Sequence, residues 1–219
     1  NATSGAVSVT NLVKVTGSQS DMTAALVTEA SKVTFAAANT LAEVSTAVTA
    51  SQGQAIAATT NISAAFAGGV TDSVANLYDT NNTAISTNFN AIKTEDSDVA
   101  VTIDDGAFSA NTNNNTIAAA RLSAIGNATT GTVTVSNAVK ITGSQSDVTA
   151  ALVTEASKVT ASSALVTISD NGFTNTNATI AASDLKNIGN ATSGAVTVTN
   201  AVKITGTQSD VTAALVTEA

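Results

Sequence analysis

Two acidic turns carry the oxygen atoms that a calcium ion would need. The stretches DDG at 104–106 and DNG at 170–172 occupy matching places in two similar parts of the chain. Carboxylate and amide oxygens are the ligands that Ca²⁺ prefers, and the candidate ligands are Asp104, Asp105, Asp170 and Asn171. Neither stretch has the spacing of an EF-hand or of a GGxGxDxUx repeat, and a plain Asx-rich turn accounts for the same residues. We therefore expect no cofactor, with calcium at these turns as the alternative.

Seven tripeptides have the pattern N-x-[ST], which accepts N-linked glycans in secreted proteins. They begin at Asn1, Asn61, Asn81, Asn114, Asn127, Asn177 and Asn190. Because the chain is rich in Asn, Ser and Thr, such tripeptides also arise by chance. They are candidate glycosylation sites on this pattern alone.

The residues that are missing remove whole classes of chemistry. The chain has no Cys, His, Pro or Trp, so thiolate nucleophiles, disulfides and imidazole general bases are excluded. The charged residues recur once per repeat, as Asp21, Asp147 and Asp210 do, whereas a catalytic cluster is normally single and asymmetric. These carboxylates are better explained as helix caps, solvated faces and pairs between repeats. We expect the protein not to be an enzyme.

The charge and hydropathy of the chain also limit its partners. Eight basic and 16 acidic residues give a net charge of −8 and a pI near 4.2. Polyanions would be repelled, so we expect no nucleic-acid partner. The chain contains no run of 18 apolar residues, so we expect no membrane insertion.

Internal repeats are the strongest signal in the sequence. Residues 1–34, 127–160 and 190–219 are nearly identical, and their starts differ by 126 and by 63 residues. Residues 101–126 match residues 166–189 in the same way. A unit of about 63 residues therefore recurs through the second half of the chain.

Apolar spacing within one unit alternates between the periods of strands and helices. Residues 133–141 predict two short strands with a corner near Ser136, and residues 145–159 predict a helix capped by Ser144. Residues 164–170 contain the β-branched run Val166, Thr167 and Ile168 and predict a strand. Residues 183–189 predict a second short helix that ends at Gly189.

Each unit is thus strand–helix–strand–helix, and stacked units could bury the apolar stripes that a single unit leaves exposed. The predicted fold is an α/β repeat solenoid with parallel strands and a long α-helical insertion; a β-solenoid is the alternative. The predicted division is a partial solenoid repeat at 1–34, the insertion at 35–98 and solenoid repeats at 99–219.

The insertion is expected to be a coiled-coil-like hairpin or one long helix, because its apolar residues follow steps of three, four and seven. Such a helix could dock against neighbouring subunits. The candidate assembly contacts are Leu41, Val44, Val48, Phe66, Leu77 and Tyr78.

Several segments resemble the tandem arrays of very large secreted or cell-surface proteins of marine bacteria, especially cyanobacteria. These segments are LVTISDNG, TIAASDLKNIGNATSGAVTV and KITGTQSDVTAALVTEA. The resemblance implies an extracellular or cell-surface scaffold or adhesive role, with cell-surface glycans among the partners.

The sequence begins at the first position of a repeat and stops inside one, with no polar capping segment. Solenoids with open ends expose strand edges that pair with other chains. We therefore expect self-association into a homopolymer: a structural subunit of an extracellular filament or surface layer. The alternative is a repeat spacer segment of a large cell-surface adhesin.

Overall fold

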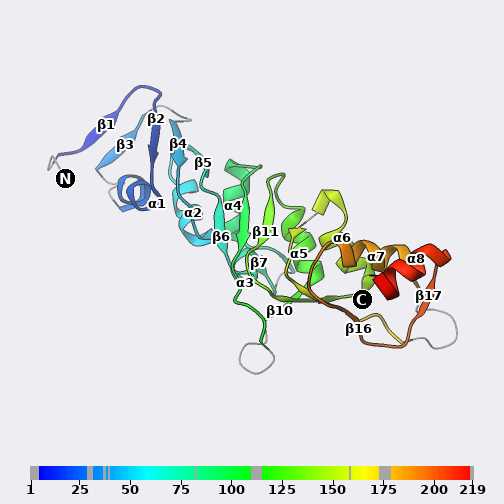
Figure 1. The fold of residues 1–219 in the computed structure, drawn as a ribbon. Coiled ribbons are helices and arrows are strands. Elements are labelled where there is room, and N and C mark those ends of the chain that lie inside the picture. Colours follow the sequence, from blue (N-terminus) through cyan, green and yellow to red (C-terminus); the bar gives the residue numbers. More distant parts are fainter. Residues whose placement is uncertain are drawn as a thin grey trace. The chain divides into compact units, whose positions relative to one another are not determined.

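The computed structural model describes residues 5–28, 32–36, 38, 40–81, 83–109, 115–157, 159–172 and 179–217. Within these residues the chain is an α/β fold with several parallel sheets and eight α-helices, and none of the described sheets closes into a barrel (Figure 1). The chain divides into two compact units, residues 1–102 with 128–132 and residues 103–127 with 133–219.

The first unit alternates short strands with short helices. Its strands are β1 (Val7–Val9), β2 (Lys14–Gly17), β3 (Val33–Phe35), β4 (Thr40–Val44), β5 (Ile62–Ala65), β6 (Val70–Asp72), β7 (Tyr78–Asp79) and β8 (Ala84–Ile85), and β9 (Val101–Ile103) lies at the division. Its helices are α1 (Gln19–Met22), continued by the π-helix η1 (Thr23–Thr28), then α2 (Ala50–Ala57), α3 (Val74–Leu77) and α4 (Thr87–Glu95). Strands β2, β4 and β5 form one parallel sheet, β1 and β3 pair in parallel, and β7 and β8 pair antiparallel.

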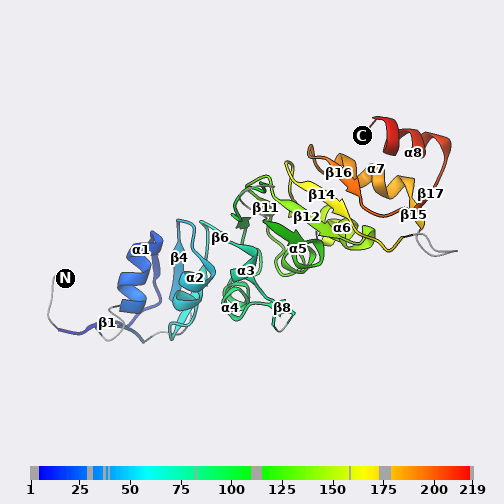
Figure 2. The same ribbon diagram turned by 90° about the horizontal axis from the view of Figure 1, so that it is seen from below.

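The second unit is built in the same way. Its strands are β10 (Thr116–Ala118), β11 (Val133–Val135), β12 (Lys140–Gly143), β13 (Val159–Thr160), β14 (Leu165–Ile168), β15 (Thr179–Ala181), β16 (Val196–Val198) and β17 (Lys203–Thr205). Its helices are α5 (Ala119–Gly126), α6 (Gln145–Leu152), the 3-10 helix η2 (Glu155–Ser157), α7 (Ala182–Asn190) and α8 (Gln208–Thr212), which the π-helix η3 (Ala213–Thr217) continues. Strands β10, β12, β14 and β16 form a parallel sheet in that order, and β15 pairs with β17 (Figure 2).

The core of the second unit is a ladder of β-branched residues across its sheet. Ile117 pairs with Ile141, Ile141 with Val166, and Val166 with Val196. Ile117, Ile141 and Val166 are at most 3% exposed. Equivalent side chains therefore stack on one another, and the predicted parallel strands are confirmed.

Most elements predicted for the repeat are confirmed. Strands β11 and β12 flank the expected corner, β14 lies in the segment predicted as a strand, and α7 matches the second helix. Ser144 caps α6 as expected, because its Oγ accepts a hydrogen bond from the Asp147 N–H at 3.2 Å. One boundary was wrong: α6 ends at Leu152, and Val159, expected in this helix, lies in β13. The β-solenoid alternative was also wrong, because the helical segments are helices.

The long helix or helical hairpin expected at 35–98 was wrong. This segment contains β4 to β8, and its longest helix, α4, has nine residues. In β4 burial alternates, so that Ala42 and Val44 are buried while Leu41 is 36% exposed. Short strands joined by corners place apolar residues at irregular steps of two to seven, and these steps imitate a heptad pattern.

Ser, Thr and Asn side chains bind one strand–helix set to the set before it. Thr192 Oγ1 donates to Ala164 O at 2.6 Å, and Asn200 Nδ2 donates to Asp170 O at 2.6 Å. Thr129 and Asn137 make the same bonds one repeat earlier, to Val99 O at 2.7 Å and to Asp105 O at 2.9 Å. Thr and Asn side chains at the repeated strand corners thus satisfy backbone carbonyls of the preceding layer.

Candidate assembly surface

Three copies of one layer carry the repeated sequence. The N-terminal layer is β1, β2, α1 and η1; the middle layer is β11, β12 and α6; and the C-terminal layer is β16, β17, α8 and η3. Residues 190–219 differ from residues 127–156 at four of 30 positions and from residues 1–30 at five. Any difference in their surroundings therefore comes from the layers beside them.

The middle layer is buried and the C-terminal layer is not. The buried apolar side chains of the middle layer are at most 7% exposed; they are Val133, Val135, Val139, Ile141, Val148, Ala151 and Leu152. Identical residues in the C-terminal layer are all more exposed; they are Val196, Val198, Val202, Ile204, Val211, Ala214 and Leu215. Leu215 is 48% exposed and its neighbour Val216 is 73% exposed.

Neighbouring elements account for this difference. Helix α6 contacts α5 on one side and α7 on the other, and β12 lies between β10 and β14. Helix α8 contacts α7, and β17 pairs with β15, but no described element covers their other side. The C-terminal layer thus presents the apolar face that α7 and β14 cover in the middle layer.

Three helix starts are also bound by the layer that follows them. The Gln19 N–H, at the start of α1, donates to Thr46 Oγ1 at 2.8 Å. The Ala50 N–H of α2 donates to Asp72 Oδ2 at 2.9 Å, and the Gln145 N–H of α6 donates to Asp170 Oδ2 at 2.6 Å. These bonds satisfy backbone donors that have no partner inside the helix. Gln208 holds this position in α8.

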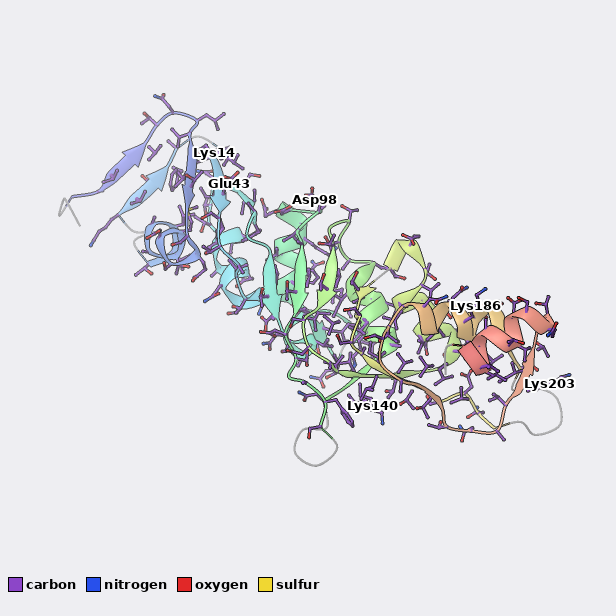
Figure 3. All side chains as sticks on the ribbon, viewed as in Figure 1. Lys14, Glu43, Asp98, Lys140, Lys186 and Lys203 are labelled. Atoms are coloured by element: carbon purple, nitrogen blue, oxygen red, sulfur yellow. The ribbon has the colours of Figure 1, made fainter. Side chains whose placement is uncertain are left out.

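Charged side chains pair across adjacent layers. Lys14 Nζ on β2 lies 2.8 Å from Glu43 Oε2 on β4 (Figure 3). Lys186 Nζ on α7 lies 3.9 Å from Asp210 Oδ1 on α8. Lys140 Nζ lies 5.5 Å from the centre of the Phe108 ring, within the range of a cation–π contact. The expected pairs between repeats are therefore present, with partners that differ from layer to layer.

The four candidate calcium ligands lie in turns whose polar groups already accept hydrogen bonds within the protein. Asn137 Nδ2 donates to the backbone carbonyls of Asp104, at 3.4 Å, and of Asp105. The Asp170 carboxylate accepts from the start of α6, and Asn171 is exposed. The described residues contain no group of three or more acidic side chains placed to hold a metal ion.

Four of the seven sequons lie within the described residues. Asn61, Asn81, Asn127 and Asn190 are exposed. Asn61 has φ 64° and its Nδ2 donates to Phe35 O at 2.6 Å, so this amide serves a turn. Asn1, Asn114 and Asn177 lie outside the described residues, and glycosylation stays a prediction.

The predicted assembly contacts do not form a surface. Val44, Val48, Phe66 and Leu77 are at most 2% exposed inside the first unit. Tyr78 is half-buried in the β7–β8 hairpin and Leu41 is exposed. Val44 lies in β4 and Leu77 in α3, while Val48 forms an isolated bridge and Phe66 follows β5. All four pack inside the first unit and not on a projecting arm.

One carboxyl of the first unit has a shifted pKa. Burial raises the pKa of Asp96 above its ordinary value of 3.8, and the hydrogen bond and negative charge of Asp98 raise it further. The Phe66 N–H, which donates to Asp96 Oδ2 at 2.6 Å, acts in the opposite direction. Asp96 thus anchors the end of β5 through a carboxylate that is costly to ionise.

A groove of about 440 Å³ recurs at the same repeat position in each unit. In the first unit Leu26 and Val33 line it, and in the second unit Leu152 and Val159 do. It follows the seam between a helix end and the next layer. No cluster of chemically reactive side chains lies among the residues that line either groove.

No protein-family model, curated protein or solved structure matches this chain. Among the described residues, no helix has the length and apolar character needed to cross a membrane.

Proposed function

We propose that the protein is a structural subunit whose stacked layers form an α/β solenoid, and that it polymerises through exposed layer faces into an extracellular filament or surface layer. The site that carries this role is the C-terminal layer. Its apolar residues are of the kind that form a core in the middle layer, yet in the described chain they lie at the surface.

The proposed solenoid is supported by parallel pairing between strands that lie 22 to 30 residues apart in the chain. Thr40 pairs with Ile62, Lys140 with Leu165, and Val166 with Val196, which are 22, 25 and 30 residues apart. Parallel pairing at such intervals requires the chain to return to the same side once per layer. Each layer then contacts the ones before and after it, as in other repeat proteins.

One observation carries the assembly role: seven identical apolar positions are buried in the middle layer and more exposed in the C-terminal layer. Burial of apolar area is the main favourable term in association. Exposed edges of β16 and β17 add backbone donors and acceptors that a further strand would satisfy. A layer from another copy that covered this face would bury the apolar side chains and pair with the strand edges.

The absent catalytic residue types and the repeated carboxylates support a non-enzymatic role. The resemblance to repeat arrays supports an extracellular or cell-surface location. Cell-surface glycans remain proposed partners, and calcium remains a proposed stabiliser of the turns at 104–106 and 170–172.

The test is assembly of the purified full chain over a range of concentrations. We expect a threshold above which fibres or sheets are visible by negative-stain microscopy and sediment rapidly. A chain that remains monomeric at every concentration up to the millimolar range would contradict the proposal and favour a spacer segment of a large adhesin.

A further inference from the structure

One turn of the second unit contains the only Asn-Gly pair in the sequence, Asn171-Gly172. The pair lies shortly after β14, directly behind Asp170, and both of its residues are exposed. In such a pair the side-chain amide of the asparagine and the next backbone nitrogen can react with each other, because glycine has no side chain to hinder their approach. The turn is therefore a candidate for a covalent change that needs no enzyme.

Asp170 is anchored on both sides, whereas the two residues after it are not. The Asp170 carboxylate accepts a hydrogen bond from the Gln145 N–H at 2.6 Å, and its backbone carbonyl accepts one from Asn200 Nδ2 at 2.6 Å. Within the part of the chain that the structure describes, neither the Asn171 side-chain amide nor the Gly172 N–H makes a hydrogen bond. Both reacting groups are thus available to each other.

The backbone at Gly172 also has room to move. A Cβ added there would lie 3.9 Å from the nearest atoms of the next layer, whereas a Cβ added at Gly194 would lie 2.1 Å from a backbone carbonyl oxygen. Ring closure requires the backbone to leave its resting dihedral angles, and glycine permits a wider range of these angles than any other residue. The surroundings of Gly172 do not oppose this motion.

The other asparagines lack this combination of features. Asn137 and Asn200 use Nδ2 to bind carbonyls of the preceding layer, and Asn61 Nδ2 binds a carbonyl in the first unit. No other asparagine of the sequence precedes a glycine, so the next side chain hinders attack by the backbone nitrogen. Asp105-Gly106 has the glycine, but a carboxylate is a poorer electrophile than an amide. The reaction should therefore select Asn171.

We propose that Asn171 is a site of spontaneous deamidation and isoaspartate formation. The Gly172 backbone nitrogen attacks Asn171 Cγ and forms a succinimide ring, while the bond from Cγ to the side-chain nitrogen breaks. That nitrogen leaves as ammonia, with the proton that Gly172 N–H gives up. Water then opens the ring at one of its two carbonyl carbons. Opening at Cγ gives aspartate, and opening at the backbone carbonyl carbon gives isoaspartate.

The product differs from the starting chain in charge and in backbone length. A carboxylate replaces a neutral amide, which adds one negative charge to the net charge of −8. In isoaspartate the main chain runs through Cβ and Cγ and is one carbon longer. The change falls beside Asp170, which binds both adjoining layers. This inference concerns a covalent modification and does not depend on the proposed assembly.

The test follows the folded full chain in mildly alkaline buffer, which favours loss of the Gly172 N–H proton. Trypsin cuts after Lys158 and Lys186 and so isolates Asn171 in one peptide for mass spectrometry. We expect aspartate and isoaspartate at position 171, with release of one ammonia per modified chain. An isoaspartyl-specific methyltransferase should label the product. The rate in the folded chain should lie within about tenfold of the rate in a synthetic peptide of residues 166–174.

Two variants serve as controls. Gly172→Ala adds a methyl group that hinders ring closure, and its Cβ meets no atom closer than 3.9 Å, so the fold is retained. Asn171→Gln keeps a side-chain amide but makes it one carbon longer, so that closure requires a larger ring. Both variants should lose most of the ammonia release and of the methyl label at this turn.

Three results would overturn the proposal. The first is an unreacted Asn171 in the folded chain under conditions in which the peptide reacts, because the fold would then protect the turn. The second is a Gly172→Ala variant that reacts as fast as the wild type. The third is a folded chain in which another asparagine reacts faster than Asn171.

Discussion

Leu152 and Leu215 occupy the same repeat position, yet Leu152 is 2% exposed and Leu215 is 48% exposed. Helix α6, which carries Leu152, lies between α5 and α7, whereas α8 and η3 pack against α7. The same side chain is therefore part of a core in one layer and of a surface in the other.

This pair gives a matched test of packing. Leu152→Ala should lower the free energy of unfolding by about 2–5 kcal/mol, because it leaves a cavity in a filled core. Leu215→Ala should change the free energy of unfolding of the monomer by at most about 0.5 kcal/mol. Urea denaturation at low protein concentration measures both. Equal losses for the two variants would mean that the C-terminal layer is covered within the chain.

Gly194 should tolerate no side chain. A Cβ there would lie 2.1 Å from Ala164 O, where the two layers meet at a corner. Gly194→Ala should cost about 1–3 kcal/mol, because the backbone must shift to admit the methyl group. Gly172 is the control, since the nearest atoms to its added Cβ lie 3.9 Å away. The melting temperature of Gly194→Ala should be clearly lower than that of Gly172→Ala. Equal melting temperatures would contradict the close approach of Gly194 to the Ala164 carbonyl.

Asp170 should act as a helix cap. Its carboxylate accepts from the Gln145 N–H at 2.6 Å, so Asp170→Ala should lower stability by about 0.5–2 kcal/mol. Asp104→Ala is the control, because Asp104 is exposed and it is its backbone carbonyl that accepts a hydrogen bond from Asn137 Nδ2.

Addition of millimolar calcium or of a chelator should leave the wild-type melting temperature unchanged if the cap is the whole role of Asp170. A rise with calcium that Asp170→Ala abolishes would restore this turn as a metal site.

Asp96 should make stability depend on pH. Its pKa is raised chiefly by burial, so the folded chain holds this proton at higher pH than the unfolded chain does. The contribution of this carboxyl to the free energy of unfolding is fully present below its pKa in the unfolded chain. It is lost as the pH rises through its pKa in the folded chain.

Asp96→Asn should therefore flatten the decline in unfolding free energy as the pH rises above about 4, measured by urea denaturation across a pH series. Asp98→Asn should reduce the decline only in part, because burial of Asp96 remains. An unchanged pH dependence in Asp96→Asn would contradict the shifted pKa.

Much of the second unit could be predicted from the order of its residues. Ser144 followed by Asp147 marked the start of α6, and the β-branched run at 166–168 marked β14. Local signals were sufficient there because caps and strand propensities act within a few residues. At 35–98 the helix predicted from apolar spacing was wrong, because short strands joined by corners can show the same apolar spacing as a helix.

The exposed C-terminal layer could be located only from the tertiary structure, which shows the layers that lie beside it. Sequence alone determined the repeated layers, their strands and helices, and the chemistry they lack. The tertiary structure decided that Ile141 and Leu152 are buried while Ile204 and Leu215 are more exposed. Identical residues cannot encode different burial by themselves, because burial depends on which layers lie on either side.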